Sequence, residues 1–388
     1  MKKIICMFFM AAVLAALCAC GKMQETPSNS GNQQAAQTPR GDSGSQSISK
    51  HMTETLCDGF EIDADIPVPV SSALSTYQAK PFHISSDDAV SLLVKESERE
   101  IETNQKDSDD PNGFKLKLKN GIEIYHQSGR LLYWSETADK DDEIFDLLFR
   151  YKEKHIEEET HILSFMSPQE AIKQGEDLID KLDIIGESVV QTIVGLSSED
   201  IMAWQSALLK DDNYKSWTDI GKTWIFEDLT DEDDAYLISF SFIYSDVHVF
   251  NQDIEPGVTS ASDNFSPMSM KVDMLITAKG LRYFSLQNAL NADGNTSESQ
   301  NLISSEQALQ KLIGKYENTI TFGTQCIIEV WLEYIPISDP NSHSIDAPVT
   351  LKPYWCFGMI DTELGREYGI VNAERINAIT GDDFTYGG

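Results

Sequence analysis

FKLKLKNGIEIYHQSGRLLYW, residues 114 to 134, is the stretch that decides the fold class. Apolar and polar residues alternate over Phe114–Leu118, which is typical of a strand with one buried face. Asn120-Gly121 is a strong hairpin signal, and Ser128-Gly129 marks a second turn. The stretch therefore predicts an antiparallel meander of three strands.

A capped helix is predicted before this meander, running from Ser85 to about Glu102, and the same start recurs along the chain. In each copy a serine is followed three positions later by an acidic or amide residue, which is the spacing of a capping box. The pairs are Ser85–Asp88, Ser167–Glu170, Ser197–Asp200 and Ser304–Gln307. Strand-like segments follow at 236–250, 268–277, 281–286, 326–334, 351–360 and 368–379. This order predicts an α+β fold of tandem modules, each an antiparallel β-meander packed against one or two helices.

An export signal occupies the N-terminus. Lys2 and Lys3 precede an apolar run, residues 4–17, that is too short to span a membrane comfortably. The run ends in Leu17-Cys18-Ala19-Cys20-Gly21, which resembles a bacterial lipobox. The resemblance implies cleavage before Cys20 and lipidation of its thiol, so that the lipid holds the protein on the membrane. The alternative is an ordinary cleaved signal with incidental cysteines.

Composition divides the chain further. Residues after Cys20 are rich in Ser, Gln, Gly and Asn, and they bury too little apolar surface to offset the entropy of ordering. We therefore expect a flexible tether before the folded part. The predicted boundaries are a signal peptide at 1–19, the lipidated cysteine and linker at 20–53, and modules at 54–160, 161–300 and 301–388.

The charge is strongly acidic. The chain has 63 Asp and Glu residues against 30 Lys and Arg residues, a net charge of −33. Such a surface repels phosphate groups, so nucleic acid is excluded as a partner. It can attract cationic peptides or extracellular divalent cations.

The C-terminal segment carries a family resemblance. Pro353-Tyr354-Trp355 lies in one strand, and Asn377-Ala378-Ile379-Thr380-Gly381 closes the next. These motifs resemble PepSY-like modules of exported bacterial proteins and the YycH/YycI-type regulators of sensor kinases. Residues 60–69, FEIDADIPVP, resemble the opening of an uncharacterised family of Firmicute lipoproteins. The resemblance implies a fold and an extracytoplasmic location, and it supplies no catalytic residues.

The cysteines and aromatics of the last module are the candidate functional residues. Cys326 and Cys356 lie in neighbouring strand-like segments and form a possible disulfide. Together with Cys57 they are equally consistent with small buried side chains.

Trp331 lies between Glu329 and Glu333 on one strand face, opposite a face with Cys326 and Val330. If the glutamate face is solvated, Trp331 is partly exposed and becomes a partner-binding residue with Tyr354 and Trp355. Alternatively, Trp331 packs under the 336–348 loop.

Metal and catalytic signals are weak. The seven histidines form no HExxH motif, and His155, Glu159 and His161 fit a solvated acidic helix end. The acidic run 107–110 imitates part of a calcium loop, but Pro111 stands at a ligand position and no Glu closes the loop. The run 231–234 fits a solvated loop. Without a nucleophile elbow, a Walker loop or a GxGxxG motif, we predict no catalytic residue, metal or cofactor.

These observations predict a lipid-anchored extracytoplasmic binding or regulatory lipoprotein that engages an envelope protein or peptide. The alternative is an extracytoplasmic hydrolase without a recognisable motif. A solute-binding lipoprotein is disfavoured, because the chain lacks the alternating βαβ pattern of a two-lobed binder.

Overall fold

The structure of the chain is a computed structural model. It divides into two compact units, Met1–Gln37 and Thr38–Gly388, and all described residues belong to the second. The structure describes residues 47–108, 110–135, 162–210, 229–250, 269–317, 323–338, 344, 346–363 and 372–384.

Four α-helices begin directly after the four predicted serines, which confirms those helix starts. The helices are α2 (Ser86–Leu93), α4 (Pro168–Ile179), α5 (Ser198–Leu208) and α7 (Ser305–Tyr316). Reciprocal capping boxes are present at Ser167, Ser197 and Ser304. None of the helices among the described residues has the length and apolarity that a membrane span requires.

Helix α2 is shorter than predicted, because it ends at Leu93 rather than near residue 102. Arg99 folds back over its C-terminus, where Nε donates to the Val94 carbonyl at 2.9 Å and Nη2 donates to the Ser91 carbonyl at 2.8 Å. These hydrogen bonds satisfy carbonyl groups that have no partner within the helix, and so stabilise the early end.

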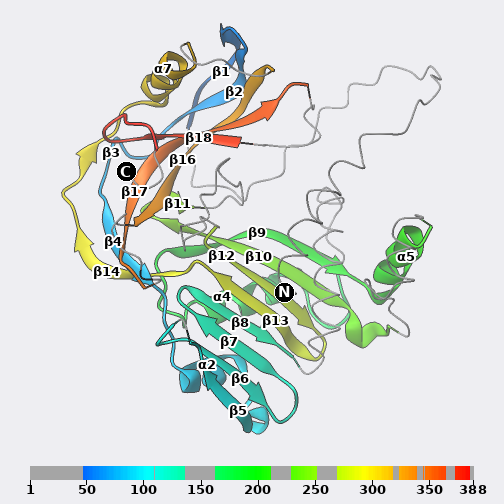
Figure 1. Ribbon diagram of the computed structural model, residues 1–388. Helices are drawn as coiled ribbons and strands as arrows, with labels where there is room; N and C mark the ends of the chain where they lie inside the picture. The colour runs from blue at the N-terminus through cyan, green and yellow to red at the C-terminus, as the bar shows by residue number, and fades with distance from the viewer. Residues whose placement is uncertain are drawn as a thin grey trace, which may run out of the picture. The chain divides into compact units, whose positions relative to one another are not determined.

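Sixteen strands form one mixed sheet (Figure 1). They are β1 (Ser47–Cys57), β2 (Phe60–Val68), β4 (Tyr77–Pro81), β5 (Ile101–Lys106), β6 (Phe114–Leu118), β7 (Glu123–Gln127), β8 (Arg130–Trp134), β9 (Glu187–Leu196), β10 (Ala235–Tyr244), β11 (Val247–Val249), β12 (Lys271–Thr277), β13 (Gly280–Gln287), β14 (Leu290–Thr296), β16 (Gln325–Ser338), β17 (Val349–Asp361) and β18 (Asn372–Asn377). A separate two-stranded sheet joins β3 (Ala73–Leu74) to β15 (Gln300–Asn301). The predicted meander corresponds to β6, β7 and β8.

The strand order mixes distant parts of the chain. The main path is β14-β4-β17-β16-β11-β10-β12-β13-β8-β7-β6-β5, while β1, β2, β9 and β18 pair off this path. Two pairings are parallel, β11 with β16 and β16 with β2, and the others are antiparallel.

The predicted α+β fold class of tandem meander modules is therefore wrong. Strand β8 pairs with β13, with Trp134 opposite Tyr283, and β4 pairs with β17, with Ala79 opposite Val349. Residues expected in separate modules are thus neighbours in one large, mostly antiparallel sheet. The physical reason is that strands pair through backbone groups, and the choice of a distant partner leaves little trace in the local sequence pattern.

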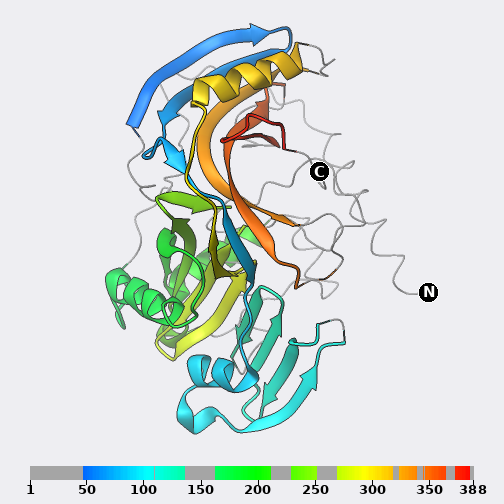
Figure 2. The same ribbon diagram turned by 90° about the vertical axis from the view of Figure 1, so that its left-hand side faces the viewer.

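Helices cover parts of the sheet at close range. Helix α4 packs on β10 through Gly175, where an added Cβ would lie 2.6 Å from Cζ of Phe240. Helix α7 lies alongside the β1–β2 hairpin (Figure 2), and Tyr316 stacks on Phe60 with ring centroids 4.2 Å apart. Both contacts belong to the main hydrophobic core, which runs along the sheet.

Candidate functional site

The three predicted recognition aromatics are all buried. Trp331 is 7% exposed, Tyr354 is 6% exposed and Trp355 is fully buried. Trp331 and Tyr354 belong to one cluster, whereas Trp355 lies in the main core and donates from Nε1 to the Ile303 carbonyl at 2.9 Å. The expectation that Trp331 is partly exposed is thus wrong, and these residues form no joint exposed surface.

A β-bulge explains part of this difference. The pairing of β16 with β17 shifts register between Ile327 and Glu329. Before the shift Cys326 pairs with Ile360, and after it Trp331 pairs with Cys356. Positions 356 and 360 of β17 share a face, so the bulge brings Cys326 onto the face of Trp331. Strict alternation along this strand had predicted that Cys326 and Trp331 lie on opposite faces.

One of the two glutamates on the face expected to be solvated is also buried, whereas Glu329 is half-buried. Glu333 is fully buried, with Oε1 3.6 Å from Nε of Arg375 and 3.1 Å from Sγ of Cys356, which donates to it. The Arg375 guanidinium lies 5.6 Å from the ring centroid of Phe250 and 5.9 Å from that of Phe384. A charge-compensated polar cluster therefore occupies this face under aromatic cover.

The predicted disulfide partners are not brought together. Cys57, Cys326 and Cys356 are free thiols. The strand partner of Cys326 is Ile360, four residues from Cys356 along β17. Four residues of strand span about 13 Å, whereas the Cα atoms of a disulfide lie about 4.4–6.8 Å apart.

An open groove lies beside this face, over β1, β2, β16 and β17. Its volume is about 530 Å³. Three acidic residues, three threonines and three apolar residues line it. The lining residues are Glu54, Glu61, Asp63, Thr53, Thr55, Thr362, Ile62, Cys326 and Ile360. None of these lining residues is a Lys or Arg, so the groove is acidic.

Strand register places the polar groups of the groove. Thr53 pairs with Asp63, and its hydroxyl donates to Oδ1 of that aspartate at 3.0 Å. Glu61 lies between Thr55 on β1 and Cys326 on β16. Glu54 pairs with Ile62, so its side chain lies on the opposite face of the hairpin from Glu61 and Asp63.

His51 stands at the end of this acidic row. Its Nδ1 lies 2.9 Å from Asp65 and its Nε2 lies 3.1 Å from Asp63. Hydrogen bonds to Asp65 first, and to Asp63 second, raise the pKa of the exposed His51 ring. Protonation of His51 at lower pH therefore adds a positive charge at this end of the row.

The weak metal signals of the sequence have different outcomes. His155, Glu159 and His161 lie outside the described residues. In the 231–234 run, Asp231–Asp233 form a 3₁₀ turn without a buried residue, as expected of a solvated loop. Asp234 differs, because it is buried and accepts the Ser198 N–H at 2.7 Å.

The 107–110 loop differs, because Asp110 is fully buried. Among the described residues, one group of three side chains is close enough to share a metal ion, and it joins Asp110 to His83 and Asp346. Sequence reasoning missed His83 and Asp346, since the three residues are far apart in the chain and no motif spacing connects them.

Comparisons with known proteins identify a related fold and no family. No family model matches the chain, and no curated protein matches it either. A crystal structure of an uncharacterized protein from Eubacterium rectale is similar, with a TM-score of 0.53 and 14% sequence identity. The match covers 86% of this chain and 93% of that one. At this identity the similarity shows that the two chains share a fold.

Proposed function

We propose that this chain is a lipid-anchored extracytoplasmic binding protein whose acidic groove takes a basic, extended segment of an envelope protein or peptide. The proposal rests on one observation above the others, the row of carboxylates in an open groove without a lining Lys or Arg. The lipobox-like sequence ending at Cys20 supports the location.

The shape of the groove favours an extended ligand. Its volume of about 530 Å³ is within the usual range of ligand pockets, about 300–1,000 Å³. Among the described strands β1 pairs with β2 alone, so its second edge offers backbone N–H and C=O groups. An extended segment can pair with such an edge and place alternate side chains toward the groove.

The charge of the groove favours a basic ligand. Lysine or arginine side chains of a partner would meet the carboxylates of Glu61 and Asp63, which share a face of the hairpin with the hydroxyls of Thr53 and Thr55. The net charge of −33 adds long-range attraction for a cationic partner. Because the groove is open, we expect this binding to weaken as salt rises.

Peptide titration tests the groove. The mature protein is titrated with a fluorescent peptide of alternating lysine and threonine, and with a matched peptide in which glutamate replaces lysine. We expect saturable binding of the lysine peptide alone. Glu61→Gln and Asp63→Asn should each weaken it by up to about fivefold, the equivalent of one exposed ion pair.

Glu298→Gln is the matched control, because it removes the same charge from an exposed position outside the groove lining. Equal affinity of the wild type and both groove variants would contradict the proposal.

The anchor is tested separately. Cys20→Ala should leave the signal uncleaved and abolish incorporation of radioactive palmitate, because its thiol is the proposed attachment point. Equal labelling of the variant and the wild type would refute lipidation at Cys20 without affecting the groove.

A further inference from the structure

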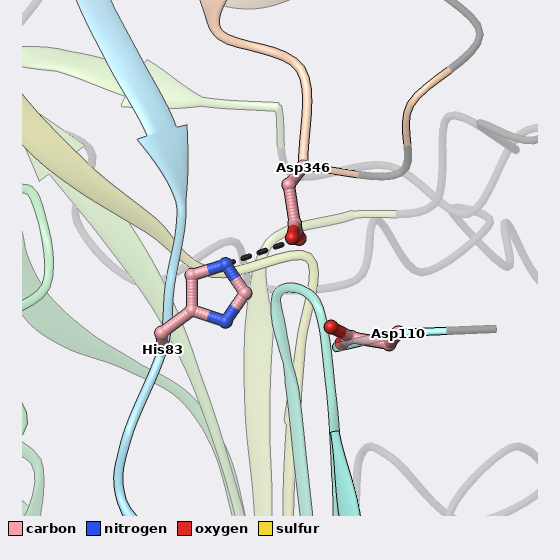
Figure 3. A group of neighbouring side chains, drawn as sticks. All are labelled: His83, Asp110 and Asp346. Carbon is pink, nitrogen blue, oxygen red and sulfur yellow. Dashed lines mark ion pairs between the residues drawn. The ribbon is translucent and has the colours of Figure 1, made fainter. Parts of the chain in front are cut away.

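Three ligand-type side chains converge from segments that are far apart in the sequence (Figure 3). His83 follows β4, Asp110 lies in the loop between β5 and β6, and Asp346 precedes β17. One ligand atom from each residue lies within 4.8 Å of the other two. His83 Nε2 and Asp346 Oδ1 are 3.1 Å apart.

A relay of hydrogen bonds fixes the orientation of the His83 ring. Nδ1 of His126 lies 2.8 Å from the Arg130 carbonyl, which can only accept, so this nitrogen carries a proton. In a neutral His126 ring Nε2 then accepts, and Nδ1 of His83 donates to it across 3.4 Å. The lone pair of His83 Nε2 is thereby directed toward the two carboxylates, as in metal-binding histidines held by an outer partner.

Both carboxylates are held in place by neighbouring groups. Asp110 accepts the Asn112 N–H at 2.8 Å and the Ser128 N–H at 2.7 Å. Asp346 accepts the side-chain amide of Asn112 at 3.3 Å through Oδ2. Its other oxygen, Oδ1, is buried and lies 3.1 Å from Nε2 of His83, without the geometry of a hydrogen bond.

Two carboxylates share the space with a single histidine, and a neutral His83 would oppose its lone pair to Oδ1 of Asp346 at 3.1 Å. A buried carboxylate oxygen without a donor is costly. A cation between the three ligand atoms would satisfy all of them.

We propose that His83, Asp110 and Asp346 bind a divalent transition-metal ion, with zinc as the best-suited ion. Imidazole nitrogen with carboxylate oxygens suits zinc, whereas calcium prefers an all-oxygen set. Ligand atoms around tetrahedral zinc lie about 3.4 Å apart, close to the 3.1 Å between His83 and Asp346. The ligand atom of Asp110 lies within 4.8 Å of the other two, so it needs to approach by at most about 1.4 Å, and water would complete the coordination.

The ion would tie the loop between β5 and β6 to the segment that enters β17. This inference is independent of the proposed function, because the three ligands are not among the residues that line the acidic groove.

Calorimetry of the mature protein, purified without a histidine tag and stripped with chelator, tests the site. Titration with zinc chloride should show one ion bound per chain and a higher melting temperature. His83→Gln and Asp346→Asn should each weaken binding at least tenfold, and circular dichroism should confirm that both variants fold.

His51→Gln is the matched control. His51 also contacts two aspartates, but it is exposed and both of its ring nitrogens already have hydrogen-bond partners. Its variant should bind zinc as the wild type does. The proposal is overturned if zinc does not bind saturably, if either site variant retains wild-type affinity, if the His51 variant loses binding, or if calcium binds in place of zinc.

Discussion

Replacing Trp331 with alanine separates a packing role from a recognition role. The indole is 7% exposed and packs with Phe250, Ile335 and Tyr354. These neighbours belong to β16, β17 and the end of β11, whose paired backbones restrict collapse into the space left by the ring. We therefore expect a loss of about 3–5 kcal/mol of unfolding free energy, the range for a buried aromatic residue.

The corresponding shift in melting temperature follows from the size of the folded unit. Thr38–Gly388 holds about 350 residues, and an unfolding entropy of about 2.1 cal/mol/K per residue gives about 0.7 kcal/mol/K for the unit. The expected decrease is therefore about 4–7 °C. Differential scanning calorimetry measures it directly, with Trp331→Phe as a control that restores much of the packing.

Peptide binding to the groove is the second readout. At a temperature where Trp331→Ala is folded, its affinity for the lysine peptide should equal that of the wild type. A variant that melts within 1 °C of the wild type and loses binding would refute the burial argument. It would restore Trp331 as a recognition residue.

Three further changes test the fold. Gly175→Ala should destabilise the protein, because the added methyl group overpacks against Phe240 at a cost of about 1–3 kcal/mol, while alanine improves helix propensity by about 1 kcal/mol. An unchanged urea denaturation curve would show that α4 does not pack on Phe240 through this residue. The backbone N–H of Ser167, and to a lesser degree its hydroxyl, donate hydrogen bonds that lower the pKa of Glu170 from 4.5. These hydrogen bonds therefore stabilise the folded protein above pH 4.5, and the stabilisation disappears as pH falls through the lowered pKa. Glu170→Gln should flatten the acid limb of the stability curve, and an identical limb in both proteins would exclude the capping carboxylate as its source. Ser304→Ala should cost about 0.5–2 kcal/mol without changing groove affinity, and reduced affinity at an unchanged melting temperature would assign the serine to binding.

Local structure was predictable because its causes are local. The side chain of Ser304 accepts the N–H of Gln307 at 3.1 Å, which is the cap expected from the spacing. Strand β6, Phe114–Leu118, has the predicted bounds and an alternating burial pattern. Caps and hairpins involve residues a few positions apart, so one stretch of sequence holds both partners.

Distant pairing was not predictable from the same patterns. The bulge after Ile327 changes which side chains of β16 share a face, and no residue type in that stretch indicates a bulge. The cluster of His83, Asp110 and Asp346 exists only because the sheet order brings β4 beside β17. The acidic run 107–110 was the one local hint, since together with Asn112-Gly113 it resembles part of a calcium loop.

The mixed strand order has a consequence for how the chain reaches this fold. Strand β2 pairs with β16 and β4 pairs with β17, so these N-terminal strands can complete their pairing only with residues 325–361. Folding of this kind is slow, because long loops must close before the pairings that stabilise them can form. Truncation before residue 325 would leave β2 and β4 without those partners and prone to aggregation. Strands β2 and β4 should therefore reach their final pairing only when the last strands of the chain are available.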